Sequence, residues 1–123
     1  MAAQSQPATG AFETHRKQKV LAIDEKIKAA EEKVKVAEEK ANVADAKFTA
    51  AEANAKAAEV QFNALKHSTE FSHDPRAATQ IEVALVSLKA ARNVSTVYLA
   101  GLQNMNEQHA LALASLRQLE AEK

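Results

Sequence analysis

An unbroken three-four spacing of small and apolar residues is the feature that most constrains the fold of this chain. These residues recur alternately three and four positions apart for nearly seven heptads. A 3.5-residue period keeps one stripe of a helix facing a partner helix, which is the seam of a left-handed coiled coil. The seam positions are Val20, Ile23, Ile27, Ala30, Val34, Ala37, Ala41, Ala44, Phe48, Ala51, Ala55, Ala58, Phe62 and Leu65.

The seam lies in a long segment without glycine or proline, which predicts one helix over residues 11–67. The segment is rich in alanine, glutamate and lysine, which all have high helix propensity. At about 1.5 Å per residue, such a helix would be roughly 85 Å long. Residues 1–10 are small and polar, and we expect them to form a flexible N-terminal tail.

A second helix is predicted over residues 75–122, after a polar turn at 68–74. Asp74 can accept a hydrogen bond from the free amides of the first helical turn, and Pro75 suits the first helical position. Because the connection is short, the two helices should pack antiparallel. The sequence therefore predicts an all-α, single-domain helical hairpin over 11–123, coiled-coil-like with an alanine-rich seam.

The second helix carries its own stripe at helical spacing. If the turn is centred near Phe71, Ala58 faces Ala84 and Ala41 faces Gly101. Glycine costs about 1 kcal/mol of helix propensity, and close backbone approach to Ala41 would explain why it is tolerated. The stripe consists of Ile81, Ala84, Leu88, Ala91, Ser95, Tyr98, Leu102, Met105, His109, Ala112, Leu116 and Leu119.

Apolar residues also cover other faces of the second helix. Between Glu82 and Glu107 the only charged residues are Lys89 and Arg92. A helix that is apolar over most of its circumference is normally buried by more than one partner. We therefore predict a second, protein-interaction face formed by Val83, Val86, Val94 and Val97.

Charges beside the first seam are sorted by sign into a lysine row (Lys19, Lys26, Lys33, Lys40, Lys47) and an acidic row (Asp24, Glu31, Glu38, Asp45, Glu52, Glu59). In a parallel pair of first helices these rows would meet as opposite charges. The alternative is a solvated surface with local pairs such as Glu31–Lys35.

The opposite side of the first helix carries a second stripe of small residues, the far stripe, which recurs every seven residues. One helix with two such sides can pack against two neighbours, which favours a bundle larger than one hairpin. The far stripe consists of Ala22, Ala29, Val36, Val43, Ala50, Ala57 and Ala64.

Composition excludes several classes of protein. Hydrophobic residues make up 46% of the 123 residues, but 28 of them are alanine, so one hairpin has little apolar volume for a core. The formal net charge is zero, which argues against nucleic-acid binding. No apolar run is long enough to span a membrane, and the absence of cysteine excludes disulfides and thiolate metal sites.

Histidines are the only candidates for catalysis or metal binding. His67, Glu70 and His73 cluster at the turn, but their spacing matches no established ligand motif, and His67 suits the negative end of the first helix. His109 belongs to the second stripe, and His15 to a basic patch at the start of the first helix. We therefore predict no catalytic, cofactor or metal site, and no enzyme activity.

The expected function is that of a structural or interaction protein, a coiled-coil hairpin acting as a self-associating assembly subunit or scaffold. Its partner would be a second copy or another helical protein. The alternatives are a chaperone-like or adaptor module that holds a client between its arms, and a membrane-surface amphipathic helix. The N-terminus has no secretory signal pattern, which predicts a cytoplasmic protein or one exported without such a signal.

Overall fold

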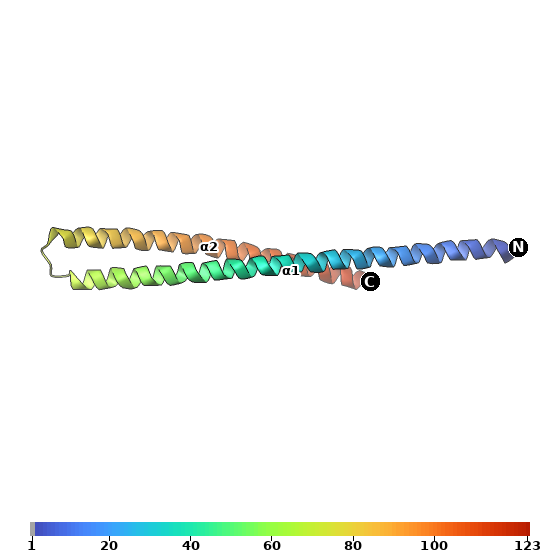
Figure 1. Cartoon of the computed structure of the whole chain (residues 1–123), viewed down its shortest axis with the longest axis horizontal. Coiled ribbons are helices and arrows are strands. Elements are labelled where there is room, and N and C mark those ends of the chain that lie inside the picture. Colours follow the sequence, from blue (N-terminus) through green and yellow to red (C-terminus); the bar gives the residue numbers. More distant parts are fainter. Residues whose placement is uncertain (1) are drawn as a thin grey trace. The chain divides into compact units, whose positions relative to one another are not determined.

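A computed structural model of the chain describes the backbone of residues 2–123 and the side chains of residues 16–123. Helix α1 spans Ala2–Ser68 and helix α2 spans Pro75–Glu122. The two helices pack against each other as a hairpin, and residues 2–123 contain no strand (Figure 1). The predicted all-α helical hairpin is confirmed.

The C-terminal end of α1 is closed by hydrogen bonds to one carbonyl. The Leu65 carbonyl oxygen accepts from the Thr69 amide at 3.0 Å, the Thr69 hydroxyl at 2.6 Å and the Ser68 hydroxyl at 3.2 Å. These donors satisfy a carbonyl that the helix itself leaves free. At its other end, α1 begins at Ala2, whereas the sequence predicted Ala11. The side chains of the proposed tail lie outside the described range, and its flexibility stays a prediction.

The start of α2 follows the predicted capping pattern. The Arg76 amide donates to Asp74 Oδ1 at 3.0 Å, and the Ala77 amide donates to the Asp74 carbonyl at 3.0 Å. Pro75 occupies the first helical position, where its missing N–H costs nothing. The Asp74 amide in turn donates to the Ser72 hydroxyl at 3.2 Å. These local bonds make Asp74 the N-cap of α2, as the sequence predicted.

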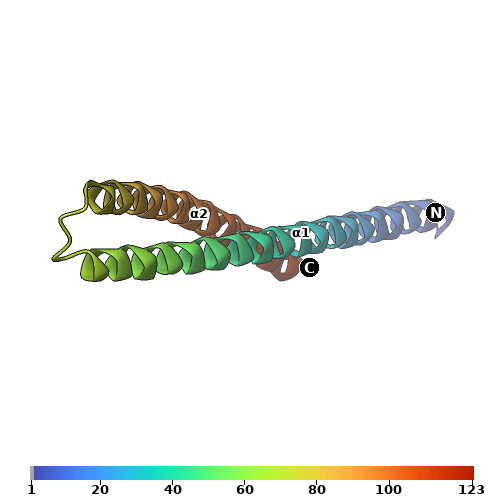
Figure 2. The ribbon, with the colours of Figure 1, turned by 60° about the vertical axis from the view of Figure 1, so that its left-hand side comes forward.

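The chain divides into two compact units, each made of a stretch of α1 against a stretch of α2. Unit 1 comprises Met1–Glu38 and Glu107–Lys123, and unit 2 comprises Glu39–Asn106 with the turn. In unit 1, Lys123 Nζ lies 2.6 Å from Asp24 Oδ1. In unit 2, Arg92 lies 3.8 Å from Glu59. Figure 2 shows the two helices of unit 2 running side by side from the turn.

The interior of the hairpin is composed mainly of alanine. Among the described side chains, the buried apolar residues are Ala30, Ala41, Ala51, Ala77 and Leu88. The half-buried apolar residues of α1 from Ile23 onward all lie on the seam, and most of those of α2 lie on its stripe. A 3.5-residue repeat thus keeps one side of each helix covered along both units.

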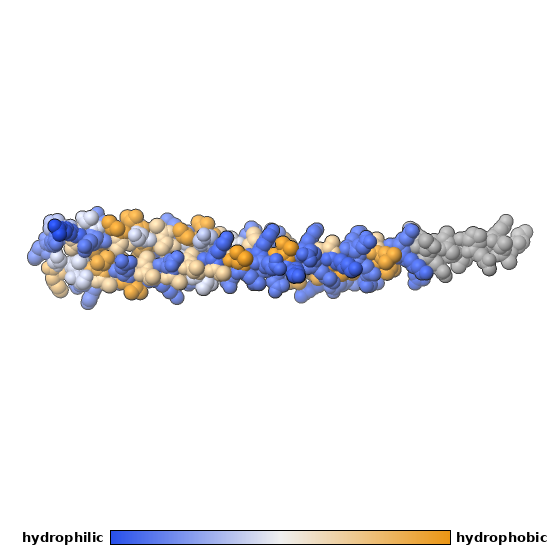
Figure 3. Space-filling model, viewed as in Figure 1, coloured by the Kyte–Doolittle hydropathy of each residue, from blue (hydrophilic) through white to orange (hydrophobic). Residues whose placement is uncertain are grey.

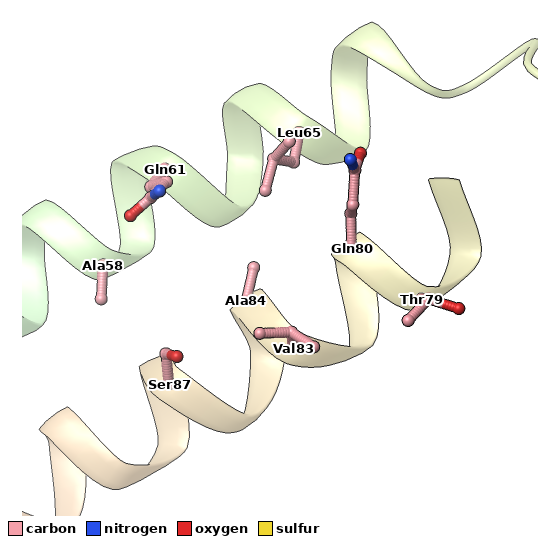
Figure 4. Close-up of a pocket in the computed structure, with 8 residues that line it drawn as sticks. All are labelled: Ala58, Gln61, Leu65, Thr79, Gln80, Val83, Ala84 and Ser87. Atoms are coloured by element: carbon pink, nitrogen blue, oxygen red, sulfur yellow. The ribbon is translucent and has the colours of Figure 1, made fainter. Parts of the chain in front are cut away.

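The register of the hairpin differs from the prediction by about one turn. Figure 4 shows Ala58 pointing toward Ser87 and Leu65 toward Ala84, whereas the sequence paired Ala58 with Ala84. Unit 1 agrees, since Lys26 and Leu119 line one groove. The connection itself agrees with the prediction to within one residue, since α1 ends at Ser68 and α2 begins at Pro75. The shift therefore lies in how the alanine-rich faces of the two helices align.

Gly101 is exposed, and a Cβ built on it would meet no atom within 4 Å. The expected close approach to Ala41 is therefore wrong, because the register moves Gly101 away from that contact. No described backbone residue, Gly101 included, has a positive φ. Nothing in the hairpin requires glycine at this position.

Replacing Gly101 with alanine should stabilise the protein by about 1 kcal/mol, because alanine loses less backbone entropy in a helix. Urea unfolding followed by circular dichroism measures this change. The matched control is Ala100→Gly, at the neighbouring exposed position, which should lower the free energy of unfolding by a similar amount. A neutral or destabilising Gly101→Ala would contradict the open surroundings of this residue.

Candidate functional site

The candidate site is an exposed apolar face on α2, the valine face, formed by Val83, Val86, Val94 and Val97. Their exposed fractions lie between 47% and 69%. Together with Ala90 they recur three or four residues apart, so they share one side of the helix. On the side of the molecule seen in Figure 3, apolar residues in orange and tan lie among hydrophilic ones over unit 2.

Charges near the valine face are few. Arg92 is half-exposed and lies 3.8 Å from the half-exposed Glu59 of α1, an ion pair that contributes about 0–1 kcal/mol at most in such a setting. Lys89 is exposed at one edge. A neutral apolar face of this kind gains free energy when another apolar surface covers it.

An open groove runs beside the valine face, between α1 and α2 near the turn. Its α1 wall is Ala58, Gln61 and Leu65, and its α2 wall is Thr79, Gln80, Val83, Ala84 and Ser87 (Figure 4). The groove exists because small residues, Ala58, Ala84 and Ser87, meet across the seam and leave space between the helices. Val83 belongs to both the groove and the valine face, so the two form one continuous surface.

The amino-acid sequence does not by itself predict this groove. The signal for it is the meeting of small side chains on both helices, but that meeting depends on the register, which the sequence placed one turn away. Gln61 and Gln80 give the groove amide donors and acceptors, and Thr79 and Ser87 add hydroxyls, beside the apolar groups that line the rest of it. Such a mixture suits an amphipathic side chain, with an apolar body and one polar end.

The residues predicted for the intramolecular seam lie on the covered side of their helices with two exceptions. Leu88 is only 3% exposed. The half-buried members are Ile23, Ile27, Val34, Phe48, Phe62, Leu102 and Met105.

The exceptions are Val20 and Tyr98, which are 46% and 40% exposed. Val20 lies one helical turn before Asp24, whose carboxylate pairs with Lys123 just after the end of α2 at Glu122. Tyr98 carries a large ring, and an alanine-rich stripe covers only part of it.

The charged rows of α1 are almost entirely exposed, as is the far stripe that includes Val36 and Val43. Two members of the acidic row form ion pairs: Asp24 with Lys123, which follows the end of α2, and Glu59 with Arg92 of α2. Because α2 covers the seam, two α1 helices cannot pair through it while the hairpin is closed. The charge rows thus face solvent or a partner on the outside of the hairpin.

The turn region carries two of the four histidines of the chain. His67, Glu70 and His73 are all exposed, and among the described side chains no group of three or more His, Cys, Asp or Glu is placed to hold a metal ion. Lys66 and His67 lie in the last turn of α1, where positive charge is favourable beside the free carbonyls. His109 is half-buried on the α2 stripe, and the side chain of His15 lies outside the described range.

The described helices include none that is long and apolar enough to cross a membrane. What the site offers is apolar contact area, a polar-edged groove and few charges. Comparisons of this chain with protein-family models, with characterised proteins and with solved structures gave no match.

Proposed function

We propose that this protein is a non-enzymatic assembly subunit or scaffold, a helical hairpin that associates with copies of itself into a larger helical bundle. The observation that carries the proposal is the composition of the interior. Among the described side chains, four of the five buried apolar residues are alanine, and Leu88 is the only large one. Burying alanine removes little apolar surface from water, so the hairpin has little to offset its lost chain entropy.

Surface area supports the same proposal. The chain exposes 9630 Å², against roughly 6,500 Å² for a compact monomer of its mass. The excess is roughly four times the ~800 Å² that each partner covers in a standard protein interface. The valine face lies on that exposed area, and association would cover it.

Mass measurement tests this proposal directly. Multi-angle light scattering on the purified chain should give a defined multiple of 13.3 kDa. The mass should fall on dilution and should not change when acidic vesicles are added. A monomer at all concentrations would contradict the proposal, and a monomer that gains helicity only with vesicles would favour the membrane-surface alternative.

A second candidate function is the adaptor or chaperone-like module, and the groove near the turn favours it. Leu65 and Ala84 give the groove apolar walls beside the amides of Gln61 and Gln80, which suits an extended client segment. Such a module should suppress aggregation of a denatured client at stoichiometric ratio. A self-associating subunit should not, because its own copies cover the same surface.

A further inference from the structure

We infer that a second copy of this chain docks antiparallel on the valine face, with the two-fold axis at Ala90 and with Tyr98 of each copy in the groove of the other. This inference rests on the proposed self-association and specifies its geometry. It concerns unit 2 alone, which contains the valine face, the groove and Tyr98.

The spacing of the valine face is the same in both directions. Val83, Val86, Ala90, Val94 and Val97 are separated by three, four, four and three residues. A two-fold contact requires that when one residue meets another, the reverse contact also forms. An antiparallel pair centred on Ala90 satisfies this rule, because Val83 lies opposite Val97 of the second copy and Val86 lies opposite Val94.

Side-chain size favours the antiparallel over the parallel pair. The groove occupies one end of the valine face, from Thr79 to Ser87, whereas the exposed and bulky Tyr98 lies at the other end. In a parallel pair the groove would face a second groove, and the bulky ends would face each other. An antiparallel pair brings each bulky end to a groove, as the close packing of protein interiors requires.

Tyr98 lies on the groove side of α2. It follows Gln80 by 18 residues and Ser87 by 11, which are close to whole numbers of helical turns, so the three share one side. With the axis at Ala90, Tyr98 comes level with Glu82 of the second copy, in the middle of the groove. Its ring would cover the small apolar floor, and its hydroxyl would reach the glutamine amides.

The charge rows of α1 are compatible with this arrangement. The two α1 helices would run antiparallel, so their lysine and acidic rows would repel each other if the helices touched. The contact stripe of α2 with α1, around Leu88, and the valine face lie on different sides of α2. The two α1 helices therefore stay on the outside, and their like charges remain apart.

Disulfide trapping tests the geometry, because the chain has no cysteine of its own. Mild oxidation should link Ala90→Cys to itself and should link Val83→Cys to Val97→Cys in a mixture. Val83→Cys alone should not link, since two copies would be about 21 Å apart along the helix, and a disulfide needs Cα atoms within about 7 Å. Gln103→Cys, exposed on another side of α2, is the matched control and should stay unlinked.

Light scattering of the same variants under reducing conditions separates the hypothesis of self-association from the hypothesis of an antiparallel contact at Ala90. An assembled protein in which Val83→Cys links to itself, or in which Ala90→Cys does not link, would overturn the antiparallel contact and leave self-association standing. A monomeric wild-type protein would overturn both. An assembled protein with the expected links supports both.

Tyrosine emission provides a second readout. Tyr98 is the only tyrosine and the chain has no tryptophan, so its fluorescence reports on this residue alone. Iodide quenching should fall as the protein concentration rises and copies assemble, because the groove covers the ring. Quenching that does not depend on concentration, in a chain whose mass shows assembly, would place Tyr98 outside the contact.

Discussion

Replacing Val94 and Val97 together with aspartate should convert the assembled protein into a 13.3 kDa monomer. In the proposed two-fold contact, these two substitutions put four carboxylates against the valines of the partner. Removing a carboxylate from water without a partner costs several kcal/mol, more than an interface built largely on valine can offset. Light scattering gives the mass, and a circular-dichroism melt at the same protein concentration should show a lower Tm.

The matched control is the pair Val43→Asp and Val60→Asp on α1. These valines are 54% and 68% exposed, against 47% and 69% for Val94 and Val97, so both pairs add the same charge at similarly exposed helical sites. The control should keep the mass of the wild-type protein. If it dissociates while the α2 variant keeps its mass and Tm, the contact lies on α1 and the valine face is not the interface.

Replacing Leu88 with alanine should lower the free energy of unfolding by about 2–5 kcal/mol, the range for deleting a large buried side chain. Leu88 is the only large buried residue among the described side chains, at 3% exposed, so its deletion removes the largest buried apolar group of the hairpin. Urea unfolding at fixed protein concentration measures the change, because association contributes to the apparent stability.

Leu111→Ala is the control for this variant. Leu111 is an exposed leucine of α2 and has the same helix propensity as Leu88, so the substitution separates burial from local helix formation. It should change the free energy of unfolding by less than about 1 kcal/mol, as surface substitutions usually do. Equal losses at the two positions would mean that Leu88 is not the centre of the packed interior.

Local chemistry explains which elements were predictable. The three-four repeat marks the covered side of each helix, because burial on a helix follows its geometry and the side chains present. Asp74 and Pro75 mark the start of α2 because both act within one helical turn, and the structure contains the Asp74 hydrogen bond. Similarly, the valines of the valine face lie outside the stripe of α2 that faces α1, so their exposure follows from the spacing alone.

The candidate groove was not predictable to the same degree. It depends on Ala58 of α1 facing Ala84 and Ser87 of α2 across the seam. A shift of one turn would place other side chains of nearly equal size opposite each other. Alanine lines much of the seam, so neighbouring registers bury similar areas and differ little in free energy. The same shift removed Gly101 from its expected neighbour.

The sequence by itself therefore determined the two helices, the turn, the stripes that pack and the valines that do not, because each follows from contacts within a few residues. Only the tertiary structure decided how the helices are aligned along each other. That alignment placed small residues around a groove, left Tyr98 partly uncovered and made Leu88 the one large buried side chain among residues 16–123. The three-four repeat specifies which side of a helix is covered, but an alanine seam leaves its register to the turn and to the few larger side chains.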